Sequence, residues 1–338
     1  MSKKIFKIST IFAVVNFLWA GCDYKPSSFG DFQKIVVYAD SSVFKNIQPQ
    51  LEQIFDQYLY TPHLERSFLL DLRPLHELEI YKTRRNLLFI GILNEKEPVS
   101  QFVSRSLSEQ TKQAVEEGKV FEIFKEDVFA TDQVVMFFPA TSVDQLRKNL
   151  SDRGQIIFDQ FNQLYYRLLK KSMFSNGEQK EMEDYLTEKY GWKIRVQHDY
   201  EVVKETDDGS FVWLRRLNPD RSLFIYRFKT DRFDMNQKEL YALRDSLTTV
   251  FYEADSIDKA DTYMQAVKFN GLDAQKLVGV WQNQHLLIGG AFRSYVFYDN
   301  INKYVYFIDL TVTAPGKRKK PLLDQLEVIA HTFKLPGQ

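Results

Sequence analysis

The stretch FVWLRRLNPDRSLFIYRFK, residues 211–229, indicates the fold more clearly than any other part of the sequence. Two runs rich in aromatic and branched residues, 211–217 and 223–229, flank the turn sequence Asn-Pro-Asp at 218–220. Two such runs joined by a short turn predict a β-hairpin, in which the strands are antiparallel neighbours. An Asp-Asp-Gly turn at 207–209 predicts a second hairpin just before the first run.

Outward from these hairpins, strands and helices alternate irregularly, and hairpin patterns outnumber strand–helix–strand patterns. We therefore predict an α+β fold with mostly antiparallel sheets packed by amphipathic helices. Apolar residues at helical spacing predict a long helix at 142–171, which would join two hairpin-rich halves. The other predicted strands are 35–38, 87–93, 120–124, 133–138, 286–298 and 304–313, and the other predicted helices lie near 47–58, 101–117, 182–190, 236–251 and 322–333.

The N-terminus has the features of an export signal. Lys3, Lys4 and Lys7 precede an apolar run at 8–19. This run is shorter than the ~20 residues that span a bilayer, and it has the length of a signal-peptide core. Small residues then lead to Cys22, in a pattern that resembles the lipobox of bacterial lipoproteins. The resemblance implies cleavage before Cys22 and attachment of lipid to its sulfur; an ordinary secretory signal and an uncleaved anchor helix are the alternatives.

These features divide the chain into four parts. Residues 1–21 are the predicted lipoprotein signal peptide. Residues 22–33 form a polar, lipidated tether. Residues 34–175 and 176–338 are the predicted N-terminal and C-terminal α+β halves, and together they are long enough to bury a substantial core.

Composition and charge exclude several classes of function. The 45 basic and 45 acidic residues balance, and loss of the three lysines in the signal leaves a formal charge of −3. Such a chain has no global field that would attract nucleic acid, so no nucleic-acid partner is expected. Cys22 is the only cysteine. The folded part therefore has no internal disulfide, thiolate metal site or thiol nucleophile.

The sequence contains none of the common catalytic motifs. A GxSxG elbow, an SxxK motif, a Walker loop, GxGxxG and HExxH are all absent. No two of the five histidines lie three or four positions apart. Catalytic residues, a metal site and a cofactor are therefore not predicted.

Five residues are candidates for ligand binding. Strand alternation places Trp213 and Arg215 on one face of the predicted hairpin, and Arg227 lies on the partner strand. Arginine beside aromatic rings can bind an anionic ligand, although a structural ion pair is the alternative. Gly289 and Gly290 interrupt a strand pattern, which indicates a close backbone approach by a ligand or by a packed neighbouring strand.

Two other basic features have structural explanations. Arg244 lies between leucines on the inward face of the helix predicted at 236–251. A buried guanidinium needs a partner, so we predict that an acid or several carbonyls contact it. The basic run at 317–320 could contact anionic lipid headgroups, and a solvated turn is the alternative.

The second half of the sequence is similar to a known family. The similarity is carried by Trp213-Leu214-Arg215, Arg244-Asp245-Ser246, Gly279-Val280-Trp281, Ile288-Gly289-Gly290-Ala291-Phe292, Tyr298-Asp299, Thr313-Ala314-Pro315-Gly316-Lys317-Arg318 and Leu326-Glu327. With these elements the chain resembles a family of Bacteroidetes-type lipoproteins known as domain of unknown function 4837. The resemblance implies a lipid-anchored envelope protein and supplies no catalytic residues.

The functional prediction is a lipid-anchored cell-envelope lipoprotein that is a binding or assembly module. Its expected partners are membrane lipid, through acylated Cys22, and an envelope protein. An envelope hydrolase acting on glycan, peptide or lipid is the alternative, and a purely structural role is a third hypothesis. In the resembled lineage an acidic cluster after the lipidated cysteine implies surface display. Asp23 stands alone here, so we expect the outer membrane and its periplasmic face.

Overall fold

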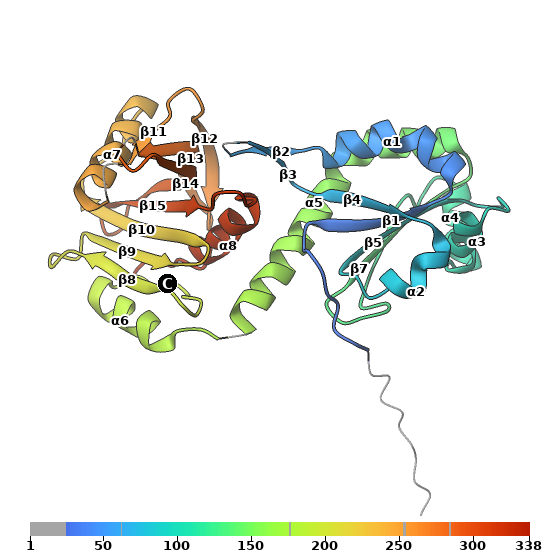
Figure 1. Ribbon diagram of the computed structural model, residues 1–338, viewed down its shortest axis with the longest axis horizontal. Coiled ribbons are helices and arrows are strands. Elements are labelled where there is room, and N and C mark those ends of the chain that lie inside the picture. The colour runs from blue at the N-terminus through green and yellow to red at the C-terminus, as the bar shows by residue number, and fades with distance from the viewer. Residues whose placement is uncertain (1–24, 62, 176, 253–254, 284) are drawn as a thin grey trace, which may run out of the picture.

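The computed structural model describes residues 25–61, 63–175, 177–252, 255–283 and 285–338. The predicted signal peptide and Cys22 lie outside the described residues. Two sheets form the cores of two halves, and helix α5 (Val143–Ser175) runs from one half to the other, as predicted for the helix at 142–171 (Figure 1). No helix within the described ranges is both long enough and apolar enough to cross a bilayer.

The N-terminal half contains a five-stranded sheet in which β4, β1, β5 and β7 run parallel and β6 is antiparallel at one edge. The α+β class with mostly antiparallel sheets is confirmed for the chain as a whole, and this sheet is the exception to the predicted pairing. In sheet order the strands are β4 (Leu69–Arg73), β1 (Lys34–Ala39), β5 (Asn86–Ile92), β7 (Val134–Ala140) and β6 (Ile123–Glu126).

The parallel pairing follows from burial on both faces of the sheet. Every residue of β5 and β7 is buried, and so is every residue of β1 after Lys34. Strands of this kind read as continuous apolar runs, because helices cover both faces of a parallel sheet. The runs at 35–38, 87–93 and 133–138 carry this signal, whereas the hairpin turns elsewhere in the chain favoured the antiparallel prediction.

Helices cover both faces of this sheet. Helix α1 (Ser41–Phe55) and the first half of α5 pack on one face, where Ile47 and Leu150 join the same core as Ile35. Val99 and Val103 pack against Val36 on the other face. The short helices of this second face are η1 (Leu75–Glu77), α2 (Leu78–Tyr81), α3 (Pro98–Arg105) and α4 (Glu109–Glu116).

The C-terminal half contains a large antiparallel sheet with the order β11-β13-β14-β15-β10-β9-β8, and β12 also pairs with β13. The hairpin predicted at 211–229 is confirmed as β9–β10, with Arg215 opposite Ser222. The strands are β8 (Glu201–Glu205), β9 (Phe211–Arg216), β10 (Asp220–Lys229), β11 (Ser256–Ile257), β12 (Tyr263–Phe269), β13 (Leu272–Asn283), β14 (Ile288–Asp299) and β15 (Tyr304–Thr313).

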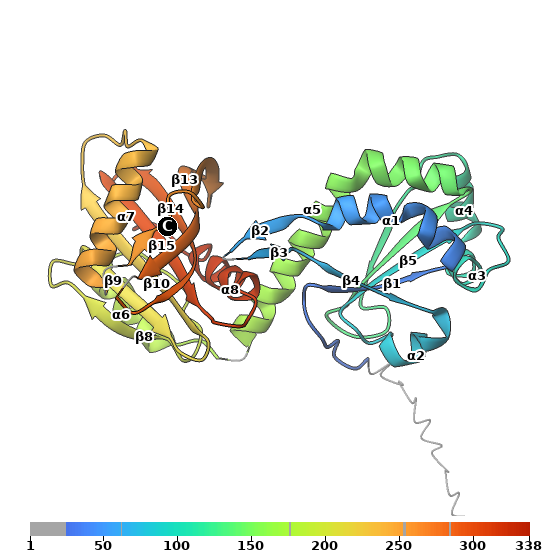
Figure 2. The same ribbon diagram turned by 45° about the horizontal axis from the view of Figure 1, so that its top comes forward.

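One helix lies on each face of the large sheet. Helix α7 (Gln237–Phe251) packs Leu240 and Leu247 against one face. Helix α8 (Lys320–Ala330) lies on the opposite face and also contacts α5 (Figure 1, Figure 2). Helix α6 (Lys180–Tyr190) follows α5 and lies near the edge strand β8 (Figure 1).

Two segments extend from the main sheets. The small hairpin of β2 (Tyr58–Tyr60) and β3 (Leu64–Arg66) reaches from the N-terminal half toward α8. The chain at 27–29 bridges to Thr131 and Arg84. The second part of the predicted tether is therefore packed against the N-terminal half.

Candidate functional site

A pocket of about 190 Å³ lies on the α7 face of the large sheet, beside the C-cap of α7. Trp213, Tyr252 and Trp281 provide its aromatic walls. The rim includes the half-exposed side chains of Leu286 and Ile288. The polar lining consists of Arg215, Asp220, Ser222, Asp255, Thr311 and Thr313.

The alternation of β9 places Trp213 and Arg215 in this pocket together, as the sequence predicted for their shared face. The register extends the same row across the sheet, since Ser222 lies opposite Arg215 and Thr311 lies opposite Ser222. Hydroxyl groups from two neighbouring strands therefore line the floor beside the indole of Trp213.

Arg227 does not belong to this site. Trp213 pairs with Phe224, so residue 227 has the opposite parity on β10 and lies on the other face of the sheet. There Arg227 donates to the carbonyl oxygens of Tyr190 at 2.6 Å and Gly209 at 3.1 Å. Its role is to hold the start of β9 against the end of α6.

Both glycines lie close to strand β13, and Gly290 lies opposite Trp281. A Cβ atom at Gly290 would lie 1.9 Å from the carbonyl oxygen of Val312 and 2.7 Å from Nε1 of Trp281. Gly290 therefore leaves room for the indole that forms one wall. Gly289 is exposed, and a Cβ there would lie 2.8 Å from the Trp281 carbonyl oxygen. The structure thus places strand β13 against both glycines.

Charged side chains and two buried indole N–H groups surround the pocket. Arg215 binds both carboxylate oxygens of Asp220, at 2.9 and 2.6 Å, and Asp255 accepts a hydrogen bond from Asn283 at 2.9 Å. Among the described residues of the lining, the charged side chains are two aspartates and one arginine. The indole N–H groups of Trp213 and Trp281 are buried and have no hydrogen-bond partner among the described residues.

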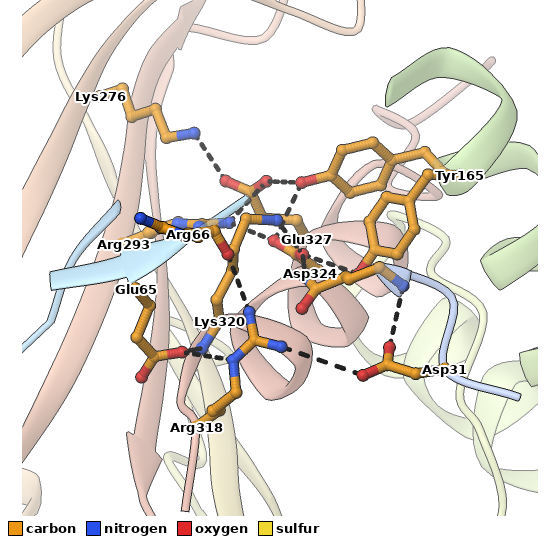
Figure 3. Close-up of polar contacts among 12 residues, drawn as sticks. Asp31, Glu65, Arg66, Tyr165, Lys276, Arg293, Arg318, Lys320, Asp324 and Glu327 are labelled. Carbon is orange, nitrogen blue, oxygen red and sulfur yellow. Dashed lines mark hydrogen bonds and ion pairs between the residues drawn. The ribbon is translucent and has the colours of Figure 1, made fainter. Parts of the chain in front are cut away.

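A second group of polar side chains lies between the halves, on the opposite face of the sheet (Figure 3). Glu327 of α8 accepts hydrogen bonds from Lys276 at 2.6 Å and Tyr295 at 2.7 Å, and it pairs with Arg293 at 2.8 Å. Burial alone would raise the pKa of Glu327, but the charges of Arg293 and Lys276 outweigh burial and hold it well below its usual range. Glu327 is therefore ionised at every physiological pH.

Asp324, one turn earlier on α8, connects this group to the N-terminal half. It pairs with Lys320 at 2.6 Å and Arg293 at 3.1 Å, and it accepts a hydrogen bond from Tyr165 of α5 at 2.7 Å. Burial opposes ionisation here as well, yet Lys320 and Arg293 lower the pKa of Asp324. Gln33 donates to the same carboxylate at 3.1 Å. Residues from the start and from the end of the N-terminal half therefore both contact Asp324.

The β2–β3 hairpin completes the contact between the halves. Glu65 accepts the backbone N–H groups of Lys319 at 2.6 Å and Lys320 at 3.0 Å, at the N-terminus of α8. A carboxylate is stabilising there, because the helix dipole and the free N–H groups favour negative charge. Arg318 donates to the carbonyl oxygen of Arg66 at 2.8 Å. Arg318 and Lys320, from the basic run at 317–320, thus make contacts within the chain.

A third candidate ligand site lies at the parallel sheet. Open α/β sheets bind ligands beyond the carboxyl ends of strands where the strand order reverses, here between β1 and β5. A cavity of about 730 Å³ lies there. The buried carboxylate of Asp40 already accepts the backbone N–H groups of Val99 and Ser100, at 2.9 and 2.8 Å. An acid of the chain therefore occupies the anion site at the start of α3, which disfavours a phosphate ligand.

The buried acids between the halves are not suited to proton transfer. General acids and bases need a pKa near the working pH, whereas Asp324 and Glu327 are held ionised by cations. Within the described ranges, no group of three or more His, Cys, Asp and Glu side chains is arranged to hold a metal ion. Sequence reasoning did not identify Tyr252 or Asp255, because their approach to Trp213 depends on tertiary packing. It also did not identify Asp220 as the partner of Arg215, although the two residues meet across the β9–β10 hairpin.

Two family models match the chain, and both describe domains of unknown function. DUF8532 matches residues 28–174, and DUF4837 matches residues 178–332. No curated protein matches the chain. The two matched segments meet near the C-terminal end of α5.

Several solved structures show weak likeness. A protein from Bacteroides thetaiotaomicron VPI-5482 is 12% identical, with 43% of this chain and 45% of that chain covered and a TM-score of 0.27. The Ran-binding protein Mog1p of Saccharomyces cerevisiae is 10% identical, with 43% and 90% covered and a TM-score of 0.30. LpqN of Mycobacterium tuberculosis, described as involved in cell envelope biogenesis, is 13% identical, with 42% and 82% covered and a TM-score of 0.27. This chain thus spans less than half of the Bacteroides protein, and likeness at this level carries no argument.

Proposed function

Residues 178–332 belong to the family described as a domain of unknown function (DUF4837), and from this premise we propose a lipid-anchored cell-envelope lipoprotein that is a binding module. The anchor is the lipid on Cys22. The binding site is the pocket between Trp213 and Trp281, which we call the tryptophan pocket. We place the protein at the outer membrane, facing the periplasm.

The anchor rests on the sequence and on the packing of the chain just after Cys22. A basic start, a short apolar run and small residues before the only cysteine support lipidation. Two or three acyl chains hold a protein stably, whereas one holds it only marginally. Thr131 donates its backbone N–H to the carbonyl oxygen of Pro26. Extended chain from Cys22 to Pro26 spans at most about 14 Å, so the N-terminal half would lie close to the membrane.

The observation that carries the binding role is the tryptophan pocket itself, a hollow of about 190 Å³ with aromatic walls and the half-exposed side chains of Leu286 and Ile288 at its rim. Concave sites lined by aromatic side chains and a few polar groups are the usual places where proteins bind ligands. The hydrolase alternative lacks similar support, because the deeply buried acids Asp324 and Glu327 are each paired with cations.

A photo-crosslinking amino acid at Ile288 tests this role in the native envelope. Ile288 lies on the rim of the pocket with 40% of its surface exposed. Ultraviolet light should produce a mass-shifted product from this position, and Trp213→Phe should reduce its yield. The matched control is Ile301, which is 83% exposed at the far end of the same strand pair. Equal products from both positions, or none from Ile288, would count against the proposal.

A further inference from the structure

We propose that a second hollow, lined by Lys170, Lys193 and Lys334, binds a phosphate monoester group. We call it the lysine pocket. It lies between the C-terminal end of α5, helix α6 and the segment that follows α8, on the α8 face of the large sheet. The tryptophan pocket is on the opposite face, so this inference goes beyond the proposed function and does not depend on that pocket.

The lysine pocket has room for a phosphate ester. Its volume is about 780 Å³, within the ~300–1,000 Å³ that is usual for ligand sites. A neighbouring hollow of about 450 Å³ lies between α5 and α8, and the two share Lys170 and His331 in their linings. Tyr166 and Val328 line this second hollow. The part of a ligand beyond its phosphate therefore has space beside an apolar wall.

The three lysines carry positive charge that the chain itself does not neutralise. All three side chains are exposed, and none forms an ion pair within the described ranges. The acids of the lining are Glu183 and Asp184. Glu183 is engaged, because it pairs with Lys180 at 2.9 Å and accepts the backbone N–H of Val196 at 2.8 Å. Asp184 alone cannot offset three ammonium groups.

Two of these lysines lie directly opposite each other. Lys193 and Lys334 form an antiparallel bridge, in which each backbone N–H donates to the other's carbonyl oxygen, at 3.0 and 2.9 Å. Side chains at such paired positions leave the same face, with Cβ atoms about 4.5–5.5 Å apart, and like charges there are destabilising. A bound anion would turn this repulsion into attraction. The pair is therefore better explained by a ligand than by the stability of the chain.

The kind of cation favours phosphate over a carboxylate. Carboxylates are matched best by the planar fork of arginine, whereas an ammonium group acts as a point charge with three donors. The arginine of the lining, Arg195, is already paired with Glu178 and stacks on Phe174. A phosphate monoester carries a charge of about −1.5 to −2 near pH 7 and three terminal oxygens. It can accept from several lysines together, which a single carboxylate does less well.

A phosphate monoester can reach the pocket from two sources, as a free ester or as a lipid headgroup. The end of α5 lies beside the chain that leads to Cys22. Lys171, next to Lys170, pairs with Asp132 at 2.5 Å, and the carbonyl oxygen of Asp132 accepts the hydroxyl of Ser28 at 2.6 Å. Ser28 is six residues after Cys22. The lipid source therefore fits the proposed anchor, whereas the free ester does not require it.

Two binding measurements on the chain from Asp23 onward distinguish these sources. This chain contains every described residue, and it carries no tag after Gln338, which also lines the pocket. Calorimetric titration at low ionic strength uses glycerol 3-phosphate, with glycerate as its carboxylate relative. Flotation uses phosphatidylcholine vesicles with and without phosphatidic acid. Binding of glycerol 3-phosphate with a dissociation constant of about 1 mM or below assigns a free ester. Flotation with phosphatidic acid alone assigns the lipid headgroup.

A matched pair of double variants locates the binding. Lys193→Gln with Lys334→Gln should weaken whichever interaction is found by about tenfold. It should also raise the melting temperature of the ligand-free chain, because the opposed charges are removed. Lys45→Gln with Lys148→Gln changes the net charge equally at exposed positions of the N-terminal half and should leave binding unchanged.

Three results would overturn the inference. The first is the absence of binding to both glycerol 3-phosphate and phosphatidic acid vesicles. The second is an equal loss of binding in the two double variants, which would indicate general attraction of anions to the surface. The third is binding of glycerate as tight as that of glycerol 3-phosphate. Crosslinking from Ile288 reports on the tryptophan pocket, so its outcome is independent of these measurements.

Discussion

Replacing Arg244 by alanine is expected to lower the free energy of unfolding by about 3–5 kcal/mol, because it leaves an uncompensated buried acid. The guanidinium and the carboxylate of Asp309 are both 0% exposed. Nε of Arg244 donates to Oδ1 at 2.9 Å and Nη2 donates to Oδ2 at 3.1 Å. The guanidinium carbon also lies 3.9 Å from the ring centroid of Phe292. The predicted acid partner of Arg244 is thus confirmed.

Urea unfolding of the chain from Asp23 onward would measure this effect. Arg232→Ala removes an exposed arginine and should change the stability by less than about 0.5 kcal/mol. The double variant Arg244→Met with Asp309→Leu replaces both charges by apolar groups, and it should recover most of the loss. A loss below about 1 kcal/mol in Arg244→Ala would contradict the structural role of this pair.

Replacing Arg293 by alanine is expected to cost about as much, 3–5 kcal/mol, through the contact between the halves. Arg293 is 4% exposed and pairs with both Asp324 and Glu327. Its removal leaves two buried carboxylates with one lysine each. Arg195→Ala, on a half-exposed pair with Glu178, is the matched control and should cost less than about 1 kcal/mol.

The pH dependence of stability is a second signature of Arg293. The pKa values of Asp324 and Glu327 are lowered in the folded protein, so the stability they contribute is present above their ordinary range near pH 4. This stability should be lost as the pH falls from about 5 toward the folded-state values. In Arg293→Ala burial opposes ionisation with less compensation, so the acid-dependent loss should be smaller. An unchanged slope of stability against pH would contradict this account.

The C-terminal fold was predictable because its signals are local. The turn at 218–220 and the alternating runs beside it are sufficient for the β9–β10 hairpin. Prediction of the parallel N-terminal sheet requires a different sequence signal, because its pairings join strands that are distant in sequence. The continuous apolar runs at 87–93 and 133–138 carry that signal, yet they resemble any buried strand unless the helices that cover both faces are known.

The candidate site was predictable only in part. Alternation within one strand places Trp213 and Arg215 on a shared face without knowledge of register. The face on which Arg227 lies can be predicted only when the strand register is known as well. In this hairpin an odd-numbered residue on β9 lies opposite an even-numbered residue on β10. Tyr252 approaches from the end of α7, and this approach depends on how the helix crosses the sheet.

The contact between the halves carried little sequence signal. Arg293, Asp324 and Lys320 are charged residues in otherwise ordinary strand and helix patterns. Their burial arises because α5 and the β2–β3 hairpin both approach α8, and these segments are far apart in the sequence. The pairing of Arg244 was predictable because its neighbours on one helix are leucines, and such periodicity is local.

Palmitate labelling in native cells, compared between the wild type and Cys22→Ser, tests the anchoring claim most directly. The wild type should incorporate labelled palmitate and partition into detergent. Cys22→Ser cannot form the thioether, so it should lose the label entirely and accumulate as unprocessed precursor. The chain from Asp23 onward should be unlabelled and should partition into the aqueous phase. Palmitate label that persists in Cys22→Ser would contradict the account, because the lipid would then be attached elsewhere.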